Sequence, residues 1–150
     1  MTSNDSLQQV LDRIAIKDVL CRYATGIDER RFDLVGDCYA ADVSFRTPEA
    51  TLAGREAVVD SAKRVDVYKA TFHLMANQLV TIDGDTANAE TYCLAHHYYD
   101  IDGVEQEYIL GVRYVDKLAR QDGTWRITDR TMHFPISRGQ TLLRNRTALS

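Results

Sequence analysis

His73 is the residue of this sequence best suited to acid–base chemistry. It lies in the apolar stretch Ala70–Asn77, at the start of a predicted strand. Its imidazole can accept and return a proton near neutral pH. The strand pattern alone leaves three roles open: a general base, a metal ligand, or a core histidine satisfied by hydrogen bonds. The metal role is the weakest, because no second histidine or carboxylate lies at a chelating spacing in the sequence.

Asp28 and Tyr23 come from one predicted helix and could both act on His73 or its substrate. Taken alone, Asp28 precedes the charged run 29–31 and resembles an ordinary loop carboxylate. If it is buried it needs a donor, because an unpaired buried charge is costly. An imidazolium at His73 would supply one, and its second nitrogen would stay available to take a proton. Tyr23 could be a core residue, or its hydroxyl could polarise a carbonyl.

His96 and His97 are neighbours on a second predicted strand and therefore point to opposite faces of the sheet. The register of the hairpin at Asp83-Gly84 decides which of them joins His73. A two-residue turn at Asp83-Gly84 selects His96, whereas a three-residue loop through Asp85 selects His97. The sequence leaves both registers open.

The first part of the chain has helical periodicity. Ser6–Gln9 resembles a capping box, which predicts a helix start at Ser6. The apolar positions change phase between residues 14 and 16, so we expect a bend or two consecutive helices. Gly26 is expected just past the helix end in a left-handed conformation, which leaves Asp28 near the carbonyl terminus. A carboxylate is unfavourable there.

Long strands rich in Val, Ile, Thr and Tyr follow from Thr71 onward. They are separated by Asp-Gly pairs at 83, 102 and 122, each a strong hairpin signal, and predict a four-stranded antiparallel meander. The expected elements are a helix from Asp33 to about Asp42, strands at 43–46 and 50–53, a helix from Gly54 to about Arg64, and meander strands at 71–82, 86–99, 105–119 and 124–136.

This order of elements predicts an α+β fold, a cone-shaped roll in which N-terminal helices pack on a strongly curved, mainly antiparallel sheet. The length of 150 residues fits a single domain over 1–150. A cavity between the helices and the sheet is the expected ligand site. Strand alternation places Arg130 opposite the core pair Trp125 and Ile127, facing solvent unless a bulge intervenes.

Charge and composition narrow the partners. The net charge of −4 argues against a nucleic-acid partner. The N-terminus lacks a signal-peptide pattern and no apolar run reaches membrane-spanning length, so we expect a cytoplasmic protein with no membrane partner. Cys21, Cys38 and Cys93 are widely spaced, which predicts small core residues rather than disulfides or a metal site.

Several motifs together resemble the SnoaL-like branch of the nuclear-transport-factor-2-like superfamily over nearly the whole chain. They are residues 16–28 (IKDVLCRYATGID), the 73–77 segment (HLMAN), residues 80–87 (VTIDGDTA), and residues 122–127 (DGTWRI) followed by Arg130. The fold implied is the same cone-shaped roll, as one SnoaL-like domain. The superfamily hosts dehydratases, isomerases, polyketide cyclases, a dehydrochlorinase and noncatalytic subunits, so the resemblance specifies fold better than activity.

The resemblance also implies a site. Asp28 and His73 are similar to the pair of scytalone dehydratase, bile acid 7α-dehydratase and hexachlorocyclohexane dehydrochlorinase, which eliminate water or HCl without a cofactor. The bile acid enzyme has a match to Tyr23, and scytalone dehydratase has a match to His97 rather than His96, which favours the three-residue loop. The tyrosines that hold a water on the substrate carbonyl in scytalone dehydratase correspond to Ile27 and Phe45. The absence of those hydroxyls argues against scytalone as substrate.

We therefore expect a cofactor-independent, metal-free lyase that dehydrates a small hydroxylated cyclic or polyketide-like substrate in a hydrophobic cavity. In this hypothesis His73 takes the proton α to a carbonyl and returns it to the leaving hydroxyl, while Asp28 orients His73. Tyr23 and His97 polarise the carbonyl or assist departure. The residues expected to bind substrate are Arg130, Asn77, Phe45 and His96.

Two alternatives to a lyase stay open. An isomerase or polyketide cyclase could use the same base, and a noncatalytic binding protein or subunit would also fit the fold. The latter would be favoured if Asp28 and His73 were too far apart to bond, or if side chains filled the cavity. Aromatic residues expected on the outer sheet face, Tyr98, Tyr108 and Tyr114, predict a homodimer or higher homo-oligomer.

Overall fold

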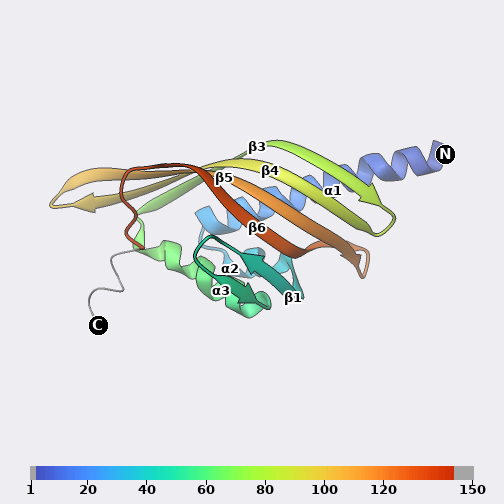
Figure 1. The fold of residues 1–150 in the computed structure, drawn as a ribbon, viewed down its shortest axis with the longest axis horizontal. Helices are drawn as coiled ribbons and strands as arrows, with labels where there is room; N and C mark the ends of the chain where they lie inside the picture. The colour runs from blue at the N-terminus through green and yellow to red at the C-terminus, as the bar shows by residue number, and fades with distance from the viewer. Residues whose placement is uncertain (1–2, 144–150) are drawn as a thin grey trace.

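Six strands form one curled sheet, and the helices lie on one side of it (Figure 1). The computed structural model describes residues 3–143. The strand order is β2-β1-β6-β5-β4-β3, and β1 pairs with β6 in parallel while the other pairs are antiparallel. The elements are α1 (Ser3–Asp28), α2 (Phe32–Asp37), β1 (Tyr39–Arg46), β2 (Thr51–Ala53), α3 (Arg55–Ala62), η1 (Lys63–Val67), β3 (Ala70–Asp83), β4 (Thr86–Ile101), β5 (Val104–Gln121) and β6 (Thr124–Arg138). The predicted cone-shaped α+β roll is confirmed.

Helix α1 is continuous, so the predicted bend is wrong, and it begins before Ser6. The change of phase marks a change of environment instead. The apolar residues before it, such as Leu7 and Ile14, are exposed, because the first turns of α1 project past the sheet (Figure 1). Those after it, such as Ile16 and Tyr23, are buried in the core. Only the second half of α1 therefore contributes to the core.

Gly26 lies inside α1 and not past its end, which corrects the prediction. A Cβ at this position would lie 2.8 Å from Cγ2 of Val35 and 3.1 Å from the carbonyl oxygen of Arg31. The missing side chain thus lets α2 pack closely against α1. The left-handed residue after the helix is Arg30, with φ of 59°. Asp28 is the last residue of α1, at the carbonyl terminus as predicted.

The helix predicted to reach Asp42 ends at Asp37. Tyr39 and the residues after it form β1, which pairs in parallel with β6, and the backbone N–H of Ile127 donates to the carbonyl of Cys38. Pairing with a distant strand overrides the local helical pattern here. The helix predicted from Gly54 is α3, and η1 extends it to Val67.

The predicted meander is confirmed as β3 to β6. The turns at Asp102-Gly103 and Asp122-Gly123 each contain two residues, with positive φ at both, as Asp-Gly hairpins require. In the first hairpin Asp83 pairs with Thr86, so the turn residues are Gly84 and Asp85. This differs from both registers considered from sequence.

Two β-bulges decide which side chains face the helices. In β3 the register shifts between Met75 and Gln78, so His73 pairs with Ala95 and shares the inner face with His97. The predicted three-residue loop is wrong, although the histidine it selected is the one that points inward. In β6 the pairing shifts at Thr128, which turns Arg130 inward. Each bulge inserts a residue and reverses the alternation beyond it.

The outer face of the sheet differs from the prediction. Tyr108 and Tyr114 are buried on the inner face, and only Tyr98 of the three lies on the outer side. Other apolar residues are exposed on outer positions of the strands: Phe72, Leu74, Leu79, Leu94 and Ile136. Within the described residues, no helix has the length and apolarity to cross a membrane.

Replacing Gly26 by Ala should lower the free energy of unfolding. Alanine favours a helix over glycine by about 1 kcal/mol, but overpacking against Val35 and the Arg31 carbonyl costs about 1–3 kcal/mol. Urea unfolding measures the balance, with Thr25→Ala as the matched change on the exposed side of α1. A Gly26→Ala protein more stable than wild type would contradict the close α1–α2 packing.

Self-association through the outer face stays a prediction, now resting on the exposed apolar residues rather than on the tyrosines. Light scattering at micromolar concentration should give the mass of a dimer or a larger oligomer. The mass of a monomer would contradict it.

Candidate active site

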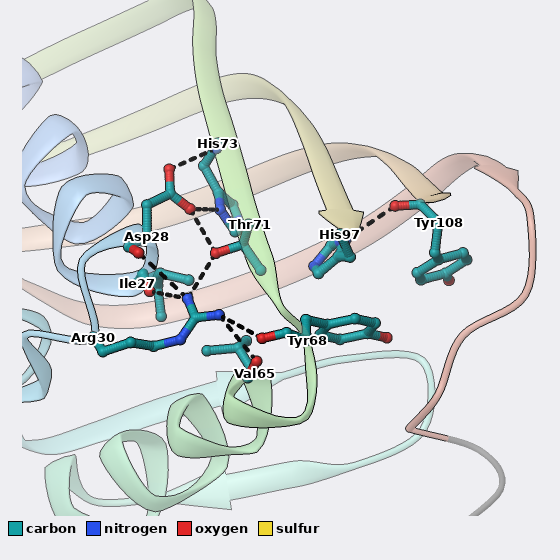
Figure 2. A network of polar contacts seen from close by, with 9 residues as sticks. All are labelled: Ile27, Asp28, Arg30, Val65, Tyr68, Thr71, His73, His97 and Tyr108. Atoms are coloured by element: carbon teal, nitrogen blue, oxygen red, sulfur yellow. Dashed lines mark hydrogen bonds and ion pairs between the residues drawn. The ribbon is translucent and has the colours of Figure 1, made fainter. Parts of the chain in front are cut away.

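Asp28 and His73 form a bonded pair where the carbonyl end of α1 meets β3 (Figure 2). Nδ1 of His73 lies 2.7 Å from Oδ1 of Asp28, and the backbone N–H of His73 donates to Oδ2 at 2.8 Å. Burial by itself would raise the pKa of Asp28, but the hydrogen bonds from His73 and Thr71 outweigh it and lower that pKa. The carboxylate therefore stays ionised and fixes both the position and the ring orientation of His73.

Thr71 and Arg30 support this pair and were not singled out from the sequence. Oγ1 of Thr71 donates to Oδ1 of Asp28 at 2.9 Å, and Nη1 of Arg30 donates to the same Oγ1 at 2.8 Å. Thr71 lies two residues before His73 on the same face of β3, which strand periodicity could have indicated. Arg30 had no such signal, because it stands in a charged run typical of a surface loop.

A cavity of about 640 Å³ lies between the helices and the inner sheet face, and His73 is part of its wall. Nδ1 of His73 is occupied by Asp28, while Nε2 has no hydrogen-bond partner among the described residues. The wall is mainly apolar and aromatic: Ile27, Phe45, Leu52, Val58, Val65, Ala95, Leu110, Val112, Met132 and Phe134. This volume suits a small organic molecule. The cavity is thus neither filled by side chains nor separated from the Asp28–His73 pair.

His97 lies on the cavity wall beside His73, with ring centroids 5.7 Å apart. Its Nδ1 lies 3.2 Å from the carbonyl oxygen of Tyr108, an acceptor, so Nδ1 carries the proton. Burial, together with the nearby His73 ring, lowers the pKa of His97 to about 4. The ring is neutral at physiological pH and offers Nε2 as an acceptor. It can bind a ligand hydroxyl, but in this form it does not donate to a carbonyl.

Tyr23 is buried on α1 and also reaches the cavity wall. Burial raises the pKa of Tyr23, against the opposing influence of the Arg130 guanidinium. Its hydroxyl therefore keeps its proton and can serve as a donor. Of the residues predicted to be catalytic, the structure places His73, His97 and Tyr23 on the cavity wall, with Asp28 directly behind His73.

Arg130 lies beneath this wall and not on it. Its side chain is 0% exposed and makes two bonds to Asp116, Nε to Oδ1 at 2.7 Å and Nη2 to Oδ2 at 2.8 Å. Its Nη1 donates to the hydroxyl of Tyr39, and its Cζ lies 4.6 Å from the ring centroid of Tyr23. The predicted direct contact with substrate does not fit this arrangement, in which Arg130 supports the tyrosines from below.

The other predicted binding residues divide in two groups. Phe45 lines the cavity. Asn77 is exposed within the β3 bulge, and His96 lies on the outer face, where its Nδ1 pairs with Glu107. Neither Asn77 nor His96 can reach a ligand in this cavity. In the part of the chain that the structure describes, no group of three or more histidine, cysteine or acidic residues is arranged to hold a metal ion.

The family model for the SnoaL-like domain matches residues 8–131. The chain belongs to the SnoaL-like family. Uncharacterised proteins of Mycobacterium tuberculosis and Mycobacterium bovis are 27% identical to it over 132 residues, which cover 83% of this chain and 86% of each relative. These relatives add no activity to the family assignment.

Solved structures share the fold. A provisionally named scytalone dehydratase of Novosphingobium aromaticivorans superposes with a TM-score of 0.83 at 18% identity, covering 91% of this chain and 93% of that one. The type 3 hexachlorocyclohexane dehydrochlorinase of Novosphingobium barchaimii gives 0.78 at 18% identity, covering 91% and 95%. A provisionally named aromatic ring hydroxylase of Novosphingobium aromaticivorans gives 0.77 at 24% identity, covering 87% and 94%. At these identities the likeness shows the fold alone.

Acid should destabilise the folded protein through His97. In the unfolded chain His97 takes a proton below about pH 6.5, whereas in the fold its pKa is lowered to about 4. Stability is therefore lost as the pH falls from 6.5 towards 4, by about 2 kcal/mol between about pH 7.5 and about pH 5. Urea unfolding at the two pH values measures this loss.

His97→Gln should lose about 2 kcal/mol less of its free energy of unfolding than wild type over this pH range, whatever the stability of the variant at neutral pH. His133→Gln removes an exposed histidine of β6 and serves as the control. If wild type and His97→Gln lose the same stability on acidification, the neutral state of His97 is contradicted.

Proposed function

We propose that this protein is a cofactor-independent lyase that removes water from a small hydroxylated cyclic or polyketide-like substrate. The observation that carries the proposal is the bonded Asp28–His73 pair, with Nδ1 held at 2.7 Å and Nε2 on the cavity side. A carboxylate that orients an imidazole through one nitrogen makes the other nitrogen a general base. The fold shared with dehydratase-type and dehydrochlorinase structures is consistent with this chemistry.

In the proposed reaction, Nε2 of His73 takes the proton from the carbon α to a carbonyl. The electron pair forms the new double bond, and the β-hydroxyl leaves. The imidazolium returns the proton to the departing oxygen, which leaves as water. Asp28 stabilises the imidazolium in the meantime, because a low pKa keeps the proton on His73 rather than on the carboxylate.

The other cavity groups divide the remaining tasks. Tyr23 keeps its proton and donates to the carbonyl oxygen, where negative charge develops. His97, neutral and with an acceptor Nε2, binds a second hydroxyl of the substrate. This revises the sequence-based role of His97, since only Tyr23 of the two can polarise a carbonyl. Ile27 and Phe45 supply apolar wall where scytalone dehydratase has hydroxyls, which argues against scytalone itself.

An isomerase or cyclase is the second candidate, and the second histidine favours it. His97 and His73 face one cavity with ring centroids 5.7 Å apart. With two imidazoles beside the ligand, a proton that His73 removes at one carbon could return at another position of the same ligand. The two reaction classes differ in product mass, because only elimination releases water.

The test is turnover of a panel of small cyclic β-hydroxy ketones, followed by mass spectrometry in normal and heavy water. We expect a product lighter by one water. His73→Ala should lower the rate about 10²–10⁴-fold, and Asp28→Asn should also lower it strongly because the imidazolium loses its counter-charge. His133→Ala, an exposed change outside the cavity, should keep wild-type turnover.

Circular dichroism of each variant shows whether the fold is intact. A folded His73→Ala protein within a few-fold of wild-type activity would remove His73 as the base. Solvent deuterium in a product of otherwise unchanged mass would favour the isomerase. The absence of turnover with specific ligand binding would favour a noncatalytic binding protein.

A further inference from the structure

We propose that Thr71 and Arg30 are positioning residues. They fix the Asp28 carboxylate, and through it the orientation of the His73 imidazole. This inference rests on the proposed function, because it concerns the same base. The network joins the end of α1, the loop after it, η1 and the start of β3 (Figure 2). Thr71 and Arg30 act on His73 through Asp28 and are not among the residues that line the cavity.

The direction of each hydrogen bond follows from the donors available. Arg30 can only donate, so the 2.8 Å contact from its Nη1 makes Oγ1 of Thr71 an acceptor. The single O–H of Thr71 then points to Oδ1 of Asp28, 2.9 Å away. That oxygen also receives Nδ1–H of His73, while Oδ2 receives the backbone N–H. With donors on both oxygens, the carboxylate has little freedom to rotate.

The Arg30 guanidinium is held by several parts of the chain. Its Nη1 donates to the carbonyl of Ile27 at 2.7 Å, and its Nη2 donates to the carbonyls of Val65 and Tyr68 at 3.2 and 3.3 Å. Its Nε lies 3.2 Å from a carboxylate oxygen of Asp66. Arg30 therefore closes the carbonyl end of α1 and ties η1 to it, which fixes the origin of the hydrogen bond to Thr71.

The backbone of Arg30 gives an independent indication. Its φ of 59° is left-handed, where glycine is the least strained residue and a long side chain is unusual. If this position served only to end the helix, glycine would serve better. The side chain must therefore contribute more than the strain costs, and its contacts lead to Asp28 through Thr71.

Arg30 is also linked to the second histidine, His97, through Tyr68. The carbonyl of Tyr68 accepts from Arg30, and the ring of Tyr68 packs on His97 with centroids 4.8 Å apart. One guanidinium thus ties together the backbone that supports both cavity histidines.

The experiment compares Thr71→Val with Thr71→Ser. Valine keeps the shape of threonine but lacks the hydroxyl, whereas serine keeps the hydroxyl. The ring titration of His73 is followed by NMR of isotopically labelled histidine, which needs no substrate. With one competing donor removed from Asp28, the carboxylate should stabilise the imidazolium more strongly, so the midpoint of Thr71→Val should move to higher pH. The other titratable or charged neighbours of the pair, His97 and Cys93 on β4 and Arg30 with its partner Asp66, are unchanged in both variants.

Kinetics and stability add two readouts. For Thr71→Val we expect kcat to fall about tenfold with KM nearly unchanged, because the variant loses the orientation of the His73 ring and not substrate binding. Thr71→Ser should restore both kcat and the titration. Arg30→Gly relieves the left-handed strain, so a purely helix-ending role predicts an equal or higher Tm. We expect a lower Tm and a His73 midpoint displaced in the same direction as in Thr71→Val.

The outcomes separate this inference from the proposed function. A Thr71→Val protein with wild-type titration and kcat, or an Arg30→Gly protein at least as stable as wild type with an unchanged midpoint, overturns the positioning role. The expected NMR shifts in a protein without any elimination activity support the network and refute the lyase. Elimination activity that depends on His73 but not on Thr71 supports the lyase and refutes the positioning role.

Discussion

The structure of the site depends on one carboxylate placed at an unfavourable position. Asp28 closes α1 at its carbonyl end, where the helix dipole disfavours negative charge. The protein compensates with three donors on the carboxylate, from the ring and backbone of His73 and from Thr71, and with Arg30 on the helix carbonyls. Because these donors come from β3 and the loop after α1, the bonds that stabilise Asp28 also dock the helix on the sheet and orient the imidazole. Fold and site share the same interactions.

Two irregularities in the strands then determine what surrounds His73. The bulge after Met75 turns His73 onto the inner face, where His97 lies, and the bulge at Thr128 turns Arg130 inward. The first places His73 on the cavity wall beside the neutral His97. The second places a cation under Tyr23, fully paired with Asp116 and removed from the ligand. Without these insertions His73 and Arg130 would lie on the opposite face of the sheet, so the chemistry of the cavity depends on them.

The sequence predicts the regular parts of this protein well and the irregular parts poorly. The Asp-Gly turns give the meander, and the family resemblance gives Asp28, His73, Tyr23 and His97 as neighbours. Alternation could not locate a bulge, so it misplaced Arg130, and the register argument reached His97 through the wrong loop. Tyr108 and Tyr114 were expected on the outer face of the sheet but lie on the inner face. The pairing of a long strand with its neighbours sets which of its residues point inward, and alternation alone does not give that pairing. Arg30 was missed because a charged run carries no sign that one of its members is folded back onto a helix end.

The central claim is that Asp28 holds His73 in one tautomer, with Nδ1 protonated and Nε2 unprotonated on the cavity side. The nitrogen chemical shifts of the His73 ring, measured by NMR in the unliganded protein at a pH where the ring is neutral, test it directly. The account predicts a protonated Nδ1 bonded to Asp28 and an unprotonated Nε2. A proton on Nε2 with Nδ1 unprotonated would mean that the cavity side of His73 is a donor, and would contradict its assignment as the base.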